Sequence, residues 1–343
     1  MFLRSASNLQ QGWTNVGREM KLENSARMLV LLFAVTSIGT RCIAQELFDG
    51  PAKGLENWSR LLQKANSGDP GAQFRVALAY EIGSAVPRDY TQAANWYRRA
   101  AEHGYPGAQN NLGGLYSRGL GVPQSDTEAL RWYMRAAAAG HPAGQNNVGF
   151  LFAEGRGAPK SDETAVFWYR KAAAQGYPGA EANLGLMYSN GRGVPADVNE
   201  AMKWYRKAVK HNFAPAEFEL GRIYLHGTKT TPDVTEAVRW FRKAAQHGLA
   251  SAQVQMGLAY SRGQGVPRDT TEAEKWYRMA AANGSPEAEH NLHVLEAMGK
   301  DTRPDRAISL ESAEINSAPS PVSDGIETLP LRPSSLLRRE GER

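Results

Sequence analysis

An asparagine recurs at one place in the sequence, at Asn111, Asn147 and Asn183, in steps of 36 residues, and again three steps later at Asn291. A side-chain amide donates and accepts hydrogen bonds at once, so it can bond both the N–H and the C=O of an extended peptide backbone. A column of such amides predicts a surface that holds a peptide with little dependence on its sequence. Neighbouring side chains would supply specificity, and for this role we select Gln109, Glu181, Phe218 and Gln253.

Basic residues recur with the same spacing. They are Arg98-Arg99, Arg135, Arg170-Lys171, Arg206-Lys207, Arg242-Lys243 and Arg278. Such a column could attract an anionic polymer or a lipid surface, but cations near the end of a helix also complement its dipole, by about 0.3 to 1 kcal/mol. We favour the helix-end role, because acidic residues are interspersed throughout and the net charge of the chain is only +5. Nucleic acid is therefore not an expected partner.

Three histidines, His103, His211 and His247, recur near the ends of the same predicted helices. Their spacing by whole repeats places them too far apart to share one metal ion, and no zinc-type cluster of Cys and His occurs in the sequence. We expect helix-end contacts for these rings, and neither a metal site nor a cofactor.

These side chains are positioned by a repeat of 36 residues. Six of the eight tryptophans mark it, at Trp96, Trp132, Trp168, Trp204, Trp240 and Trp276. In a representative repeat Pro106 begins the first helix, and the Gly-x-Gly-Val-Pro segment 119–123 ends it. Residues placed to cap the second helix recur at Ser125, Ser161, Asp197, Asp233 and Asp269, and a glycine such as Gly140 closes it.

Small residues recur where the helices must approach one another closely. They are Gly113, Gly149, Gly185, Gly221 and Gly257 in the first helix and Ala100, Ala136, Ala172, Ala208, Ala244 and Ala280 in the second. One pair of antiparallel helices cannot bury both of its faces, so neighbouring repeats must stack. The predicted fold is therefore all-α, an α/α solenoid of helix-turn-helix repeats.

We predict six full repeats and a seventh first helix over residues 68–298, preceded by a linker and an N-terminal capping helix over residues 45–67. The final helix would run from Pro286 to about Met298. Residues 299–343 carry proline, serine and mixed charge with no aromatic residue, so they bury too little apolar surface to offset their ordering, and we predict disorder there.

The segment 28–39 is strongly apolar but too short to span roughly 30 Å of hydrocarbon, which is typical of a signal peptide. We expect translation to start at Met20 and cleavage to follow Ala44, which predicts a periplasmic or secreted protein. Two alternatives are an uncleaved membrane anchor formed by residues 28–39 and lipidation of Cys42, the only cysteine. Contact with a membrane is expected only through this segment.

The repeat reads Ala-x-x-Leu-Gly-x-x-Tyr-x-x-Gly-x-Gly-Val-x-x-Asp-x-x-x-Ala-x-x-Trp-Tyr-x-x-Ala-Ala-x-x-Gly, and residues 68 to about 298 resemble the Sel-1-like repeat family, relatives of the tetratricopeptide repeats with a longer turn. Departures occur at Ala77 and Ser84-Ala85 and in the turn over 227–232. The resemblance implies a right-handed superhelix whose concave groove holds a peptide or protein surface. It also implies that the recurring asparagine faces that ligand. Alternatively, the asparagine lies on a helix surface or bonds the neighbouring repeat.

From this resemblance we expect a protein-interaction scaffold, an adaptor or regulator in the bacterial cell envelope, without catalytic residues. Some Cys-rich members of the family are described as penicillin-binding or β-lactamase-like. A hydrolase of that type is disfavoured here, because the chain has one cysteine and contains neither Ser-x-x-Lys nor Lys-Thr-Gly. A third possibility is a surface or secreted binder of polysaccharide or another host polymer.

Overall fold

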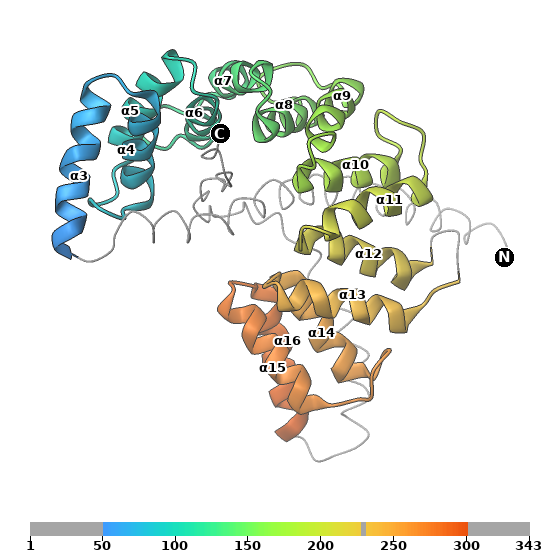
Figure 1. Cartoon of the computed structure of the whole chain (residues 1–343). Helices are drawn as coiled ribbons and strands as arrows, with labels where there is room; N and C mark the ends of the chain where they lie inside the picture. The colour runs from blue at the N-terminus through green and yellow to red at the C-terminus, as the bar shows by residue number, and fades with distance from the viewer. Residues whose placement is uncertain (1–50, 228–230, 301–343) are drawn as a thin grey trace, which may run out of the picture. The chain divides into compact units, whose positions relative to one another are not determined.

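The computed structural model describes residues 51–227 and 231–300, with side chains described from Trp58 to Ala297 outside that gap. Within these residues it contains fourteen α-helices and no strand (Figure 1). The predicted signal segment, Ala44, Cys42 and the tail from residue 301 lie outside the described residues, so the predictions made for them stay predictions. The described residues form two compact units, with the boundary between Asp197 and Val198.

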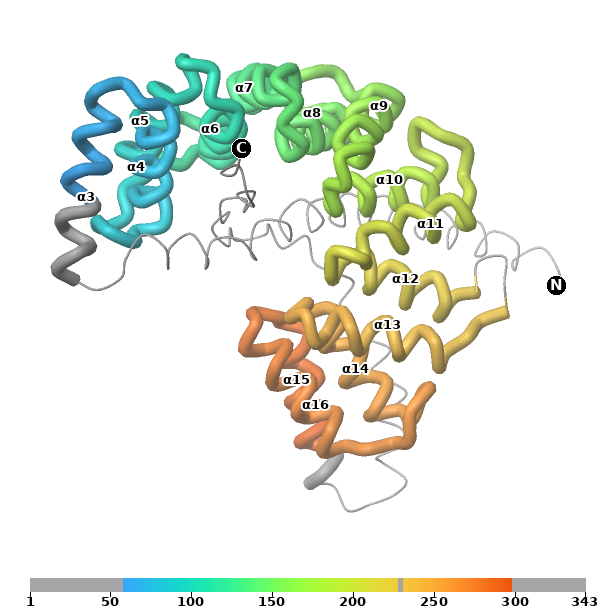
Figure 2. Tube along the Cα trace, viewed as in Figure 1, coloured from blue at the N-terminus to red at the C-terminus, as the bar shows by residue number. Residues whose placement is uncertain are grey.

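The first unit consists of an initial helix followed by three complete helix pairs and the first helix of the next pair. These are α3 (Pro51–Asn66), α4 (Pro70–Ile82), α5 (Tyr90–Glu102), α6 (Pro106–Arg118), α7 (Asp126–Ala138), α8 (Pro142–Glu154), α9 (Asp162–Ala173) and α10 (Pro178–Asn190). In the second unit, α11 completes a repeat, two helix pairs follow, and a single helix ends the series. These are α11 (Val198–Val209), α12 (Ala214–His226), α13 (Val234–Gln246), α14 (Ala250–Arg262), α15 (Thr270–Ala282) and α16 (Pro286–Lys300). The alternation of helix and turn within each unit can be followed along the trace in Figure 2.

Proline and glycine set the ends of the first helices, except that α14 begins at Ala250 without a proline. In α6, Pro106 occupies the first turn, where a missing N–H costs no hydrogen bond. At the other end Gly119 takes a left-handed conformation with φ of 67°, and its N–H donates to the carbonyl of Leu115. A side chain with a Cβ rarely adopts this conformation, so glycine ends the helix cleanly.

Four of the second helices begin at the side-chain caps predicted for them. The hydroxyl of Ser125 accepts from the N–H of Glu128, and Ser161 accepts in the same way from Thr164. In the second unit the carboxylates of Asp233 and Asp269 do the same for the helices that follow them. Each cap satisfies one of the N–H groups that a helix leaves without an internal partner.

The recurring glycine of the first helix is required by the aromatic ring of the second. A methyl group on Gly113 would lie 2.8 Å from Cδ1 of Tyr133, and one on Gly221 would lie 2.7 Å from Cδ1 of Phe241. Real Cβ atoms do not approach so closely, so the glycine lets the two helices and the buried ring pack in one layer. The predicted close approach is confirmed at these positions, and the small alanines Ala100, Ala136, Ala172, Ala208, Ala244 and Ala280 are completely buried.

The long turn packs against the preceding repeat. Gly121 lies against the backbone at Tyr90, and a Cβ there would overlap the carbonyl group of that residue. Gly157 approaches the carbonyl of Asp126 in the same way, one repeat later. The second glycine of Gly-x-Gly therefore fixes the contact between consecutive repeats as well as the shape of the turn.

Candidate interaction surface

The recurring asparagines lie on the first helices, and in the first unit they form hydrogen bonds from one repeat to the next. The Nδ2 of Asn147 donates to the Oδ1 of Asn110 at 2.9 Å, and Asn183 donates to Asn146 at the same distance. Each bond joins neighbouring first helices, α6 to α8 and α8 to α10. This geometry corresponds to the second interpretation of the recurring amide, in which it bonds the neighbouring repeat, and a direct role in ligand binding stays a prediction.

Asn111 belongs to a buried polar chain that continues into the first repeat. Its Nδ2 donates to the hydroxyl of Tyr97 at 3.0 Å, and that hydroxyl donates to Glu81 at 2.6 Å. The guanidinium of Arg118 lies 3.6 Å from Glu81. Burial raises the pKa of Glu81, an effect that Arg118 partly offsets, and burial next to this carboxyl raises the pKa of Tyr97 well above its usual value. The chain fixes the polar groups of two repeats inside an apolar layer.

Two of the selected glutamines connect consecutive helices. Gln109 is 6% exposed and its Nε2 donates to the carbonyl of Ala101, and Gln253 is 1% exposed and donates to Ala245. In both cases a residue early in the first helix ties it to the end of the preceding second helix. These two side chains hold the structure together, and little of either is accessible to a ligand.

The remaining selected residues differ in accessibility. Glu181 on α10 and Asn291 on α16 are buried, at 4% and 7% exposure. Phe218 is half-buried on α12, with its ring 5.4 Å from that of Phe241. In the first unit only Asn111 and Asn147 of the selected residues are half-exposed, so they are the members of the amide column that a partner could reach.

The basic column is occupied by contacts that the sequence analysis missed. The column has two adjacent positions in a repeat, such as Arg98 and Arg99. At the first position, arginine donates to a tyrosine hydroxyl 18 residues further on. The pairs are Arg98 with Tyr116, Arg170 with Tyr188, Arg206 with Tyr224 and Arg242 with Tyr260, at 3.0 to 3.1 Å. Between the first two pairs, at the junction of the second and third repeats, Met134 and Phe152 stand at these places, so the charge and the hydroxyl are replaced together.

At the other place a cation lies over the tryptophan of its own helix. Arg99 lies 4.5 Å from the centre of the Trp96 ring, and Lys207 lies 3.7 Å from that of Trp204. The same contact recurs for Arg135, Lys171 and Lys243. Such contacts contribute about 0.5 to 1 kcal/mol each at exposed sites. The basic column therefore stabilises the repeats through packing on aromatic rings, a contribution separate from the predicted interaction with the helix dipole.

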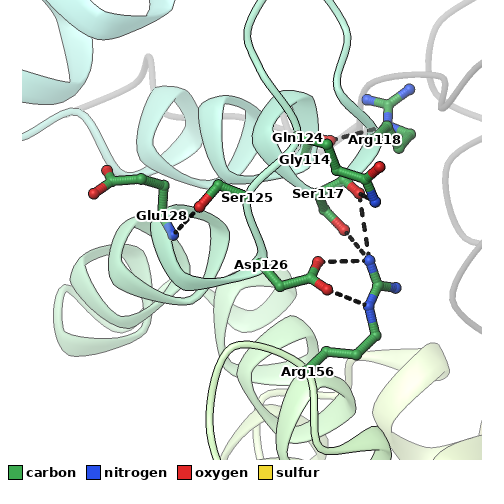
Figure 3. A network of polar contacts seen from close by, with 8 residues as sticks. All are labelled: Gly114, Ser117, Arg118, Gln124, Ser125, Asp126, Glu128 and Arg156. Carbon is green, nitrogen blue, oxygen red and sulfur yellow. Dashed lines mark hydrogen bonds and ion pairs between the residues drawn. The ribbon is translucent and has the colours of Figure 1, made fainter.

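Arginines in two of the long turns form ion pairs with the preceding repeat, one of which is drawn in Figure 3. Nη2 of Arg156 lies 2.6 Å from one carboxylate oxygen of Asp126, and its Nε lies 2.9 Å from the other. The same guanidinium donates to the hydroxyl and the carbonyl of Ser117. Arg192 pairs with Asp162 in the same way one repeat later. These bidentate pairs tie the turn of one repeat to the start of the second helix before it.

The histidines make two different contacts. Nδ1 of His103 lies 2.8 Å from the carbonyl of Arg99, which is the predicted helix-end contact. His247 instead lies 2.7 Å from the carboxylate of Glu217, a buried side chain of α12. Within residues 51–227 and 231–300 no group of three or more His, Cys, Asp or Glu side chains is arranged to hold a metal ion. In the same part of the chain, no helix has the length and apolar character needed to cross a membrane.

Six consecutive matches to the Sel1 repeat family model cover residues 70–105, 106–141, 142–177, 178–213, 214–249 and 250–285. The chain belongs to the Sel1 repeat family. The resemblance and the α/α solenoid fold predicted from the sequence are thereby confirmed. The matches include the first and fifth repeats, whose turns depart from the family pattern, so these departures leave the repeat intact.

Two solved structures have the same fold as this Sel1 repeat protein. A Sel1 repeat protein from Oxalobacter formigenes is 34% identical, with a TM-score of 0.62, over 66% of this chain and 94% of that one. A protective antigen of uropathogenic Escherichia coli strains with an SLR fold is 33% identical, with a TM-score of 0.60, over 75% of this chain and 56% of that one. The second structure is therefore of a longer protein, of which this chain spans about half.

Among curated proteins, the secretory immunoglobulin A-binding protein EsiB of Escherichia coli O6:H1 is 38% identical over 81 residues. This match covers 24% of the present chain and 14% of EsiB, so it supports shared repeats over a short segment. Sel1 repeat solenoids serve as protein-interaction scaffolds and are generally not catalytic. Membership thus gives the class of function, and the identity of the partner has to be sought in this chain's own surface.

Proposed function

We propose that this Sel1 repeat protein is a non-catalytic adaptor or regulator of the bacterial cell envelope, which holds a peptide or a protein surface along its first helices. The observation that supports this most directly is the half-exposed pair Asn111 and Asn147, held in fixed positions by Tyr97 and Asn110. Fixed amides lose little conformational entropy when a ligand binds, so a weakly sequence-dependent contact can still be useful.

The envelope location rests on the predicted signal peptide with cleavage after Ala44. N-terminal sequencing of the protein recovered from cells tests it, and a chain that begins at any residue other than Gln45 contradicts that cleavage site. The experiment is independent of the binding assay, because it depends only on the processing of the first residues.

The binding site is best tested by adding bulk, since removing Asn147 or Asn183 would also break contacts between repeats. Arg75 occupies in the first repeat the place that Asn111 occupies in the second, and α4 folds with it. Asn111→Arg loses the bond from Asn111 to Tyr97, but it should preserve the helix and obstruct the surface. Thr127→Arg, at an exposed site on α7, introduces the same side chain elsewhere and serves as the control.

The assay is crosslinking in intact cells followed by purification of the tagged chain and mass spectrometry. We expect one or more envelope proteins to be captured by the wild type and by Thr127→Arg, and to be lost with Asn111→Arg, while the far-ultraviolet circular dichroism of all three agrees. Capture of the same partners by all three proteins would place the binding site elsewhere.

A further inference from the structure

An exposed aromatic side chain interrupts the charged outer face of the first unit. Phe167 on α9 is 50% exposed, the largest exposed fraction among the large hydrophobic side chains described. At the equivalent place the other repeats have polar or charged residues, namely Asn95, Arg131, Lys203, Arg239 and Lys275. An apolar ring at a place that is otherwise charged has no role in the repeat framework, which folds without it five times.

The ring forms one wall of a hollow with a volume of about 480 Å³. Val166 and Ala174 continue the apolar surface, and Gly193, in the turn of the next repeat, closes one side without a side chain. The rings of Phe167 and Trp168 meet edge to face, with centres 5.3 Å apart. The hollow is large enough for one large apolar side chain of another molecule.

The charged groups at the hollow are mainly positive. Lys171 lies with Nζ 4.6 Å from the centre of the Phe167 ring and 4.9 Å from that of Trp168, and in the described residues no carboxylate lies within ion-pair distance of it. Arg170 also lines the hollow, where it donates to Tyr188. The only acid in the lining is Glu163, two helical turns before Lys171. A ligand with a carboxylate near Lys171 would complement this charge.

We propose that this hollow is a second binding site, which takes a segment of a partner protein in which a large apolar side chain stands beside a carboxylate. The apolar side chain contacts Phe167 and Val166, and the carboxylate accepts a hydrogen bond from Nζ of Lys171. The site lies on a second helix, α9, whereas the amide column lies on first helices, so it is separate from the surface proposed above and does not depend on it.

The probe is a short fluorescein-labelled peptide of alternating leucine and glutamate, acetylated and amidated, with a leucine-lysine peptide as its counterpart. Binding to the full chain is followed by fluorescence anisotropy. We expect the glutamate peptide to bind more tightly than the lysine peptide, and Phe167→Asn to weaken the former about tenfold through loss of the apolar contact. Asn95 already occupies the equivalent place in the first repeat, so this variant should fold.

Lys171→Gln should abolish the preference for glutamate over lysine. The matched control is Lys243→Gln, which removes the same cation from above Trp240, beside Arg239 in place of the phenylalanine. Lys243→Gln should leave both affinities unchanged. Asn111→Arg obstructs the amide column and should leave the preference for glutamate over lysine unchanged, which separates the two sites.

Equal binding of the two peptides, or equal losses with Lys171→Gln and Lys243→Gln, would overturn the proposal. So would sedimentation showing that the wild type dimerises and that Phe167→Asn abolishes the dimer, since the occupant would then be a second copy of this chain.

Discussion

The structure predicts that one histidine makes the protein sensitive to mild acid. His141 precedes α8, and its Nδ1 accepts a hydrogen bond from the N–H of Gly144 at 3.2 Å, in the manner of a helix cap. Only an unprotonated nitrogen can accept this bond. Burial lowers the pKa of His141 from 6.5 to about 4, because the charged ring is poorly solvated there.

The direction and size of the effect on stability follow from the difference in the protonation of His141 between the folded and unfolded chains. Above pH 6.5 the ring is neutral in both, and its full contribution is present. Between pH 6.5 and about 4 the unfolded chain takes up a proton that the folded chain does not, so the free energy of unfolding decreases as the pH is lowered. At about 1.4 kcal/mol per pH unit, the whole window amounts to roughly 3 kcal/mol, which is an upper bound since the ring is partly exposed to water.

The test compares the wild type with His141→Tyr. Tyr105 and Tyr177 occupy the equivalent place in the flanking repeats, so the variant keeps a ring that the framework accepts. It loses the titration and also the hydrogen bond from Gly144, and the lost bond lowers the stability of the variant by an amount that does not itself depend on pH. Urea unfolding is followed by circular dichroism from pH about 7 to about 4.5. The wild type should lose about 2 kcal/mol more than the variant over this range, because the carboxylates common to both cancel. Parallel losses in the two proteins would refute the reasoning.

Two further predictions concern packing within and between repeats. Gly221→Ala brings a methyl group against the ring of Phe241 and should lower the free energy of unfolding by about 1 to 3 kcal/mol in urea titrations, whereas Gly71→Ala, in the open first turn of α4, should cost nothing; equal effects would show that the ring can move aside. Arg156→Gln removes the paired contact with Asp126 and should cost about 1 kcal/mol at low salt and less at high salt. A double-mutant cycle with Asp126→Asn measures the interaction free energy between the two side chains. A value near zero would show that the ion pair does not stabilise the fold.

The parts of the fold that could be predicted from the sequence are those in which a single residue type has one common use. Ser125 and Asp269 could be placed as helix caps because a short polar side chain ahead of an apolar helical pattern satisfies N–H groups that nothing else can reach. The glycine at Gly113 could be identified as a close approach because its spacing matches the repeat. In both cases the reasoning needs only the residue and its period.

The parts that could not be predicted depend on which partner a side chain chooses. The sequence shows Arg98 and Tyr116, but many other acceptors lie within reach of an arginine, and only the packing of two helices selects the hydroxyl. Similarly, Asn147 can bond a ligand or Asn110, and the amide itself is compatible with both. A signal was nevertheless present, since Met134 and Phe152 change together at places where four other junctions have arginine and tyrosine.

That joint change has a consequence for how such a chain can gain or lose repeats. Each arginine and its tyrosine belong to adjacent repeats, so at these four junctions the two residues have to match. Excision of residues 214–249 would bring Arg206 opposite Tyr260 and recreate an existing junction. Excision of residues 106–141 would instead bring Arg98 opposite Phe152, which offers no hydroxyl. The repeats share one fold without being interchangeable. The order in which they follow one another is restricted by the residues at which consecutive repeats meet.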